Sequence, residues 1–382
     1  MSNLPTPSVE ALAHSEKLVA LIRDEIAANA GWIPFARYME LALYAPGLGY
    51  YTAGARKLGR EGDFTTAPEM SPLYGQTLAR QAAEVLETGL DQILEIGAGS
   101  GALAAALLTE LERLERLPRV YYILELSPDL RERERDLLAL KVPHLLERVI
   151  WLNRLPTLYQ GMIIANEVLD AMPVHLVRVG ASGVEEAGVS LHDRAFSWAW
   201  RPAAAELRSA AEALHLPKGY QTEVQLVACA FVRTLAQVMA RGVILLIDYG
   251  FPAHEYYHAE RSEGTLMCHY RHRAHADPFF LPGLQDITSH IDFSAVAHAS
   301  GEAGLDLLGY TGQAQFLINC GITDIMLRTP PEDAASYLPQ AAAAQQLLSP
   351  SEMGELFKVI ALGKDYAAPL IGFASGDRRA SL

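Results

Sequence analysis

The sequence predicts an α/β protein with a doubly wound, mostly parallel sheet, and three observations support this class. A short apolar run at 93–96 stops in a glycine turn and resumes as an Ala- and Leu-rich helical stretch at 103–111. Acidic residues stand at the ends of several apolar runs, where open α/β sheets bind their ligands. Runs typical of strands buried on both faces alternate with helical patterns, at 120–125, 149–152, 161–166 and 243–248.

A helical cover is expected ahead of the sheet. Apolar residues at helical spacing predict helices over 16–29, 35–44 and 71–86. The stretch 44–71 is rich in glycine and aromatic residues, which indicates a structural cover or a ligand lid. Its part from Gly62 to Ser71 is too polar for a core and too marked by glycine and proline for a helix.

The later segments interrupt the sheet and then complete it. Charges alternate along the expected helix after Pro128, from Asp129 to Arg135, and we expect them on its solvated face. We further expect a β insertion over 174–200, a helix over 220–240, a polar lid over 249–292, a helix near 293–301 and closing strands near 305–313 and 357–363. The predicted domains are a cover and lid at 1–90, a core at 91–364 with insertions at about 174–220 and 250–292, and a tail at 365–382.

Composition limits the class of protein. The 382 residues carry a net charge of −14, which argues against a general nucleic-acid binder. The three cysteines are far apart and indicate neither a disulfide framework nor a zinc site, and the spacing of the histidines at 254–275 does not predict a metal site either. No apolar run reaches membrane-spanning length, and the acidic residues near the start are not typical of a targeting peptide. We therefore expect a cytoplasmic protein without a membrane span.

The glycine turn is the strongest candidate for a ligand site. Gly97, Gly99 and Gly101 follow the acidic Glu95, and the spacing suits a dinucleotide as well as S-adenosylmethionine. A pyrophosphate needs backbone N–H groups, whereas the ammonium group of S-adenosylmethionine is favoured by a carboxylate such as Glu95. The remaining alternative is a tight strand–helix turn that binds nothing.

Acidic residues at the ends of later strands extend this site. Glu125 ends the second strand, where an acid accepts hydrogen bonds from a ribose diol in such folds, and the alternative is an exposed strand-end carboxylate. Glu167 and Asp170 follow the fourth strand and can pair with a planar guanidinium. Asp248 ends the fifth strand and can face the same pocket. The alternatives are an N-cap at Asn166, with acids favoured by a helix dipole, and an Asp248 that accepts from loop N–H groups.

Several motifs together resemble one family, the MidA-like S-adenosylmethionine-dependent methyltransferases. The resemblance extends from about residue 33 to residue 364 and lies in Gly49-Tyr50-Tyr51, Gly62-Asp63-Phe64-x-Thr66-x-Pro68-Glu69-x-Ser71, Glu95-x-Gly97-x-Gly99, Asn166-Glu167-x-x-Asp170-Ala171-x-Pro173, Ile247-Asp248-Tyr249-Gly250, Asp286-Ile287-Thr288-x-x-Ile291-Asp292-Phe293 and Met353-Gly354-x-x-Phe357-Lys358. The resemblance implies a class I, Rossmann-like fold. It also implies symmetric dimethylation of an arginine in a core subunit of respiratory complex I, as its mitochondrial members perform.

We therefore expect a methyltransferase that modifies a protein arginine and uses S-adenosylmethionine as cofactor. Its partner would be a protein with a target arginine, in keeping with a complex I subunit, and the sequence does not indicate an oligomeric state. An NAD-dependent oxidoreductase and a non-enzymatic assembly factor that binds S-adenosylmethionine remain as alternatives. The expected catalytic residues are Glu167, Asp170 and Asp248, and the expected cofactor contacts are Glu95, Gly97, Gly99, Gly101, Glu125, Asn166, Asp63, Thr66 and Ser71.

Overall fold

The protein divides into two compact units, each built from three segments of the chain. The computed structural model describes residues 4–53 and 66–382. The expected boundary at residue 90 falls inside the second unit, which also includes the C-terminal tail. The first unit contains Met1–Phe64, Leu169–Ala230 and Ala253–Asp292, and the second contains Thr65–Val168, Phe231–Pro252 and Phe293–Leu382.

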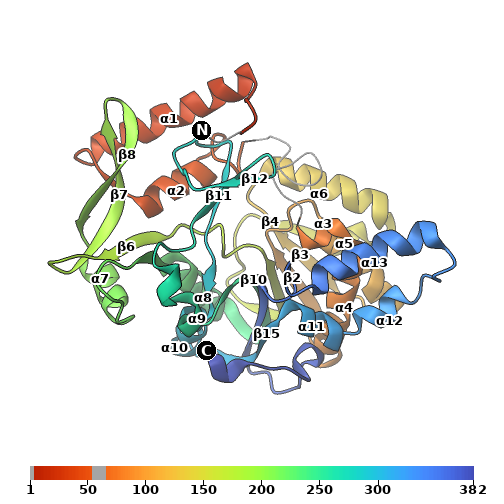
Figure 1. The fold of residues 1–382 in the computed structure, drawn as a ribbon. Helices are drawn as coiled ribbons and strands as arrows, with labels where there is room; N and C mark the ends of the chain where they lie inside the picture. The colour runs from red at the N-terminus through yellow and green to blue at the C-terminus, as the bar shows by residue number, and fades with distance from the viewer. Residues whose placement is uncertain (1–3, 54–65) are drawn as a thin grey trace. The chain divides into compact units, whose positions relative to one another are not determined.

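A mostly parallel sheet forms the centre of the second unit, which confirms the predicted fold class (Figure 1). Its strands lie in the order β15-β16-β10-β5-β2-β3-β4, and all neighbours from β10 to β4 are parallel. The closing strands were also predicted, and β16 is antiparallel to both β10 and β15. The strands are β2 (Gln92–Ile96), β3 (Val120–Leu124), β4 (Val149–Leu152), β5 (Tyr159–Asn166), β10 (Met239–Phe251), β15 (Asp306–Gly312) and β16 (Phe357–Lys364).

Helices α4 and α5 pack closely against each other in the second unit. A Cβ atom at Gly75 of α4 would lie 2.6 Å from the Cβ of Ala106 in α5, so only glycine allows this approach. Leu78, Leu107 and Ile93 join the helices and the sheet in one buried core. The helical elements of this unit are α3 (Ala67–Met70), α4 (Pro72–Glu87), α5 (Ala102–Arg113), α6 (Pro128–Lys141), η1 (Pro143–Arg148), α10 (Phe293–Glu302), α11 (Gln313–Asn319), α12 (Ile322–Met326), α13 (Ala334–Leu348), η3 (Ile371–Phe373) and η4 (Arg379–Ser381).

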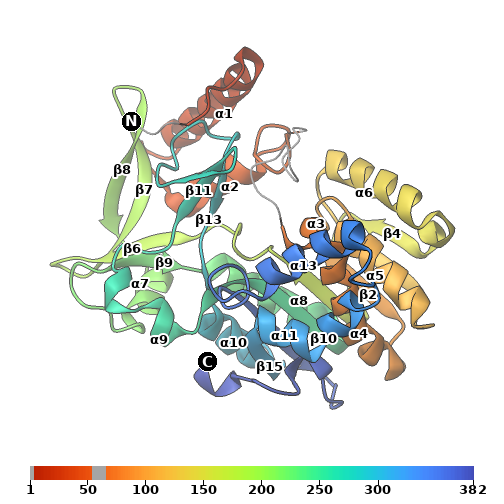
Figure 2. The same ribbon diagram turned by 45° about the vertical axis from the view of Figure 1, so that its right-hand side comes forward.

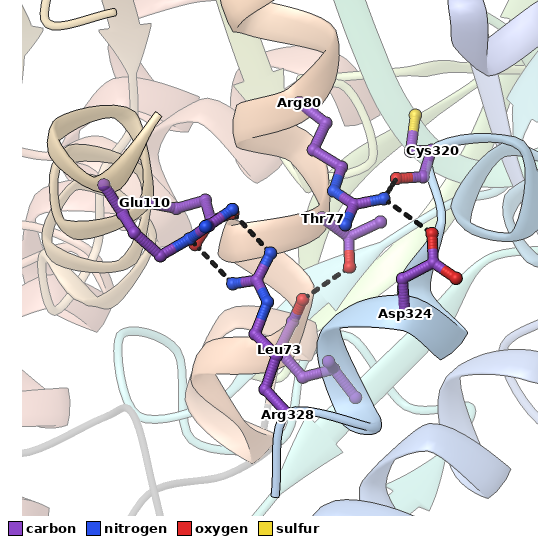
Figure 3. Close-up of polar contacts among 8 residues, drawn as sticks. Leu73, Thr77, Arg80, Glu110, Cys320, Asp324 and Arg328 are labelled. Atoms are coloured by element: carbon purple, nitrogen blue, oxygen red, sulfur yellow. Dashed lines mark hydrogen bonds and ion pairs between the residues drawn. The ribbon is translucent and has the colours of Figure 1, made fainter. Parts of the chain in front are cut away.

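A buried carboxylate, Glu110, connects α5 to the segment after α12 (Figure 3). Arg328 donates to its two oxygens at 2.7 and 2.8 Å, and Arg113 does so at 2.9 and 2.8 Å. Beside this group, Arg80 of α4 donates to Asp324 of α12 at 3.0 Å. These ion pairs attach α12 to the helices that cover the sheet.

The first unit combines helices with antiparallel strands (Figure 2). Its larger sheet has the order β1-β7-β6-β9, with β8 paired to β7, and its small sheet has the order β12-β11-β13. Helix α8 (Leu226–Val238) continues from this unit into the second. The other elements are α1 (Val9–Ala28), β1 (Ile33–Pro34), α2 (Phe35–Tyr44), β6 (His175–Val179), β7 (Val184–His192), β8 (Ala195–Pro202), α7 (Ala205–Glu212), β9 (Gln221–Val224), α9 (Ala253–Tyr256), η2 (Ala259–Arg261), β11 (Met267–Tyr270), β12 (Arg273–His275), β13 (Asp286–Thr288) and β14 (Ile291–Asp292).

Three expectations about local structure are wrong. The helix expected over 220–240 is a strand, a shorter helix and the start of β10, because buried Glu223 holds β9 against a loop. Its carboxylate accepts from Tyr256, from Leu266 and from both the backbone and the hydroxyl of Thr265, at 2.8–3.1 Å. The lid region 249–292 contains strands β11 to β13, and residues 67–70 form the short helix α3 where none was expected.

Candidate functional site

The glycine loop follows the central strand β2, at the point where the order of strands in the sheet reverses. Such a switch point is where open α/β sheets bind ligands. Gly97, Gly99 and Gly101 all adopt positive φ, at 69°, 61° and 83°. Other residue types rarely adopt this conformation, so the turn requires glycine at these positions. Because Gly101 is the N-cap of α5 and has no side chain, the first-turn N–H groups receive no cap from it.

Two of these glycines also allow close packing beneath the loop. A Cβ atom at Gly97 would lie 3.1 Å from Cγ2 of Val168. A Cβ atom at Gly101 would lie 3.1 Å from Cα of Glu134 in α6. The third glycine therefore allows the start of α5 to approach α6, in addition to shaping the ligand side of the loop.

Glu125 stands directly after β3 with its side chain almost fully buried, at 8% exposure. The alternative of an exposed strand-end carboxylate is therefore wrong. Its Oε1 accepts from the backbone N–H of Ser127 at 2.7 Å. Burial raises the pKa of Glu125 above its ordinary value, and the N–H groups of Ser127 and Leu126 offset part of that rise. This placement at the end of β3 suits the predicted contact with a ribose diol.

Glu95 lies inside β2 and is bonded to a neighbouring strand. Its Oε2 accepts from the hydroxyl of Tyr121 at 2.6 Å, and 3% of the residue is exposed. Its pKa is raised to about 7, mainly by burial; the Tyr121 bond opposes this rise and the charge of Glu125 adds to it. A cationic ligand group beside Glu95 would favour the ionised form, so the predicted contact with an ammonium stays a prediction with a clear electrostatic reason.

Asn166 and Glu167 form a fixed pair at the end of β5. Tyr74 of α4 donates to Oδ1 of Asn166 at 2.5 Å, and Nδ2 of Asn166 donates to Oε1 of Glu167 at 3.1 Å. Glu167 has a φ of 54°, and its N–H donates to the carbonyl of Ile247 at 2.9 Å. No helix follows Asn166, so the N-cap alternative is wrong. An outlying backbone held by such bonds is frequent at functional sites.

Asp248 lies within β10, three residues before its end at Phe251 and next to β5 in the sheet, and none of its surface is exposed. Its Oδ1 accepts from the N–H of Tyr249 at 2.9 Å, and Tyr249 is the next residue of the same strand. This bond lies within β10, so the alternative of an aspartate that accepts from loop N–H groups stays a prediction. Burial raises the pKa of the Tyr74 hydroxyl, and the charges of Glu167 and Asp248 raise it further. Both carboxylates therefore act on the same hydroxyl, which brings two of the three expected catalytic residues together.

Asp170, the third expected catalytic residue, belongs to the first unit, whereas Glu167 belongs to the second. Its carbonyl accepts from the N–H of Ser289 at 3.0 Å. The rings of Tyr44 and Tyr51 stack at 5.5 Å, and the charge of Asp170 contributes to a raised pKa of Tyr51, whose main cause is burial. Asp170 thus lies close to the hydroxyl group of Tyr51 in the first unit.

Three cofactor contacts were expected in the segment from Gly62 to Ser71, and the structure describes two of these residues. Asp63 lies outside the described residues. Thr66 is the N-cap of α3 without a side-chain cap bond. Ser71 is the N-cap of α4, and its Oγ accepts from the N–H of Leu73 at 3.2 Å. Ser71 therefore has a structural role that is independent of any ligand.

Three buried polar residues of the site were not identified from the sequence. Tyr74 was hidden in a helical pattern, and Glu134 was assigned to the solvated face of its helix, although none of its surface is exposed. Lys358 is 4% exposed and pairs in register with Asp248 between β16 and β10. A single lysine within an apolar strand was the signal that could have identified it.

Further observations on the described part of the chain concern metal sites, membrane spans and cysteines. Among residues 4–53 and 66–382, no group of histidine, cysteine or acidic residues has the arrangement of a metal site. Within the same ranges, no helix has the length and apolar character needed to cross a bilayer. Cys268 and Cys320 are buried free thiols, and Cys229 is a partly exposed free thiol.

Comparisons with known proteins agree with this geometry. A family model of S-adenosyl-L-methionine-dependent methyltransferases matches residues 77–311. The chain is 53% identical to a candidate methyl transferase from Burkholderia thailandensis, solved with bound S-adenosyl-homocysteine, and the match covers all of both chains with a TM-score of 0.97. It is 30% identical to the mitochondrial protein arginine methyltransferase NDUFAF7 of Mus musculus, over 87% of this chain and 81% of the relative. It is 27% identical to the Drosophila melanogaster homologue, over 97% and 91%.

These findings decide between the two ligands that suited the glycine turn. The family match spans most of the chain, including β2, β3, β5 and β10, which carry the glycine loop and the acidic residues. The high-identity structure holds the demethylated product of the cofactor. The chain belongs to this family of S-adenosylmethionine-dependent methyltransferases, and S-adenosylmethionine is its cofactor.

Proposed function

We propose that the protein is a protein-arginine N-methyltransferase in which Glu167 holds the guanidinium of the target arginine. The observation that carries the proposal is the fixed position of Glu167, between the bond from Asn166 and the backbone bond to Ile247. A carboxylate fixed in this way can accept two parallel N–H bonds from a guanidinium. The relatives named as protein arginine methyltransferases support this class of substrate.

The residues present suit S-adenosylmethionine. The loop Gly97–Gly101 would accept its methionine portion next to Glu95, and Glu125 would accept hydrogen bonds from its ribose. Asn166, at the end of β5, is assigned to the same ligand. The cofactor supplies a sulfonium-bound methyl group, so the protein mainly has to align the nitrogen that attacks it.

The acidic residues near Tyr74 have the charge that this alignment needs. A guanidinium is a poor nucleophile while its positive charge is delocalised, and a carboxylate that accepts an N–H bond favours attack by that nitrogen. Glu167 would orient the guanidinium and accept the proton that leaves the nitrogen as the N–CH₃ bond forms and the S–CH₃ bond breaks. Asp248 would add negative charge from the neighbouring strand, and Asp170 is proposed as a further contact with the substrate.

The partner, the methylated product and the cellular location of the protein are also proposals. The family resemblance supports a subunit of respiratory complex I as the methylated protein and symmetric dimethylarginine as the product. The three free cysteines suit a reducing compartment, and a cytoplasmic location is proposed on this ground. The purified protein and radiolabelled S-adenosylmethionine, added together to a lysate from a strain that lacks this protein, test the first two points, when the labelled band is identified and its arginines are analysed.

A pair of variants separates the roles of two glutamates. Glu167→Gln keeps the shape of the side chain but presents an N–H donor to another donor. Loss of a hydrogen bond to a charged group costs about 1.5–3 kcal/mol, which is roughly a ten- to hundredfold loss of rate. Binding of S-adenosyl-homocysteine should change little in Glu167→Gln and should weaken in Glu125→Gln.

Two outcomes would contradict the proposal in different ways. If Glu167→Gln weakens binding of S-adenosyl-homocysteine as much as Glu125→Gln does, Glu167 contacts the cofactor and not the substrate. If the wild-type protein binds S-adenosyl-homocysteine but transfers no methyl group to any arginine-bearing protein, the non-enzymatic assembly factor is the better description.

A further inference from the structure

Glu134 is a buried carboxyl group beside the cofactor loop, and the proposed reaction does not use it. It lies in α6 with none of its surface exposed. Its Oε2 accepts from Nε1 of Trp151 in β4 at 2.7 Å. Its Oε1 has no hydrogen-bond partner among the described residues. A fully buried carboxylate oxygen without a donor is costly when it is charged.

The backbone of Glu134 lies directly against the end of the glycine loop. The position of a Cβ on Gly101 would be 3.1 Å from Cα of Glu134, 3.4 Å from its Cβ and 3.5 Å from its Cγ. Gly101 begins α5 and ends the loop that is proposed to hold the cofactor. Any displacement of Glu134 toward water would therefore change the packing that fixes Gly101.

The charges around Glu134 oppose its ionisation. Its pKa is raised to about 8, mainly by burial and in addition by the negative charges of Glu125 and Glu95. The Trp151 bond and the charge of Arg131 act in the opposite direction. The charges that act on Glu134 come from Glu125 at the end of β3, Glu95 in β2 and Arg131 in α6. The hydroxyl of Tyr121 in β3 interacts with its charge, and Arg135 lies 4.8 Å above the ring of Trp151.

We propose that Glu134 is a positioning residue of the cofactor site and that its carboxyl group must be uncharged for the glycine loop to bind S-adenosylmethionine. The proposal depends on the placement of the cofactor at Gly97–Gly101. An uncharged Glu134 leaves Glu125 as the ionised acceptor for the ribose. A charged Glu134 would repel Glu125 and favour movement of α6 away from Gly101.

The direction of the pH effect follows from this arrangement. With its pKa raised to about 8, Glu134 is mostly protonated at neutral pH in the folded protein. As the pH rises through this value, the binding-competent form is lost, and affinity should fall by up to about tenfold for each further pH unit. A glutamine has the same shape and cannot ionise, so its affinity should not respond to this titration.

Calorimetric titration of the full-length protein with S-adenosyl-homocysteine tests the proposal. Between about pH 7 and about pH 9.5, we expect at least about a tenfold loss of affinity in the wild-type protein. Glu134→Gln should bind as the wild type does at about pH 7 and should lose about threefold at most over the same range. Ionisation of the ligand is common to all variants and cancels in the comparison. Glu132→Gln, at an exposed position of the same helix, is the control and should follow the wild-type profile.

A second variant tests the same mechanism without changing Glu134. Trp151→Phe removes the donor that favours the ionised carboxyl, so the midpoint of the pH profile should move to higher pH. Parallel profiles for wild type and Glu134→Gln, or an unchanged midpoint in Trp151→Phe, would overturn the proposal. Failure of the cofactor placement looks different, because Gly99→Val would then bind S-adenosyl-homocysteine as the wild type does.

Discussion

The ion pairs of Glu110 should contribute measurably to the stability of the second unit. The carboxylate is almost completely buried and accepts four N–H bonds from Arg113 and Arg328. Hydrogen bonds to charged groups contribute about 1.5–3 kcal/mol when buried. The side chains of Arg113 and Arg328 are 51% and 32% exposed. Water can therefore replace part of the hydrogen bonding that these arginines lose when Glu110 is substituted. We therefore expect Glu110→Gln to lower the free energy of unfolding by about 2–3 kcal/mol.

A surface pair provides the matched control. Arg116 donates to Glu87 at 2.9 Å, with side-chain exposures of 47% and 55%. Exposed pairs contribute less than about 1 kcal/mol, so Glu87→Gln should change stability little. Urea unfolding followed by circular dichroism at neutral pH measures both changes. Equal losses in the two variants would refute the argument that burial gives the Glu110 pairs their strength.

The stability difference between the wild type and Glu110→Gln should depend on pH. Burial raises the pKa of Glu110, but the bonds from Arg113 and Arg328 outweigh it and hold the pKa below its ordinary value of 4.5. A carboxyl group with a depressed folded pKa stabilises the protein above the unfolded pKa and loses this contribution as the pH falls through the folded one. The stability difference between wild type and Glu110→Gln should therefore shrink below about pH 4.5. A difference that stays constant in acid would contradict the assignment.

Two further predictions concern the cofactor. Gly99→Val places a β-branched residue at a φ of 61° and should reduce affinity for S-adenosyl-homocysteine by more than about tenfold in calorimetry. Gly89→Val, with a φ of 86° and no neighbouring atom within 4 Å of its Cβ position, carries similar backbone strain and should leave affinity unchanged. Hydrogen exchange of the amides at 66–71 should slow when S-adenosylmethionine is added, and equal exchange would make this segment a packing element only.

The sheet and its ligand loop were predictable because their signals are local. Strand β2 is an apolar run that ends in glycines, and both features follow from neighbouring residues in the sequence. The placement of Glu167 beside Asp248 was also predictable, since parallel strands that are adjacent in a sheet end at the same edge.

The parts that could not be predicted depend on partners distant in the sequence. Glu223 is buried in β9 because Tyr256, Thr265 and Leu266 satisfy its carboxylate, and a pattern of apolar residues cannot reveal these bonds. Glu134 is one of the alternating acidic and basic residues of its helix, but it packs against Gly101 and is buried. The solvated face of this helix therefore has fewer charged residues than the alternating pattern indicates.

The position of β16 has a consequence for synthesis of the chain. This strand comes last in the sheet's sequence order, yet it lies between β10 and β15 and forms the ladders of both. A nascent chain therefore exposes the open edges of β10 and β15 until Lys364 has left the ribosome, and such edges favour aggregation. Pairing of residues so far apart in sequence also slows folding. Chains that end before β16 should be recovered as insoluble protein or chaperone-bound intermediates.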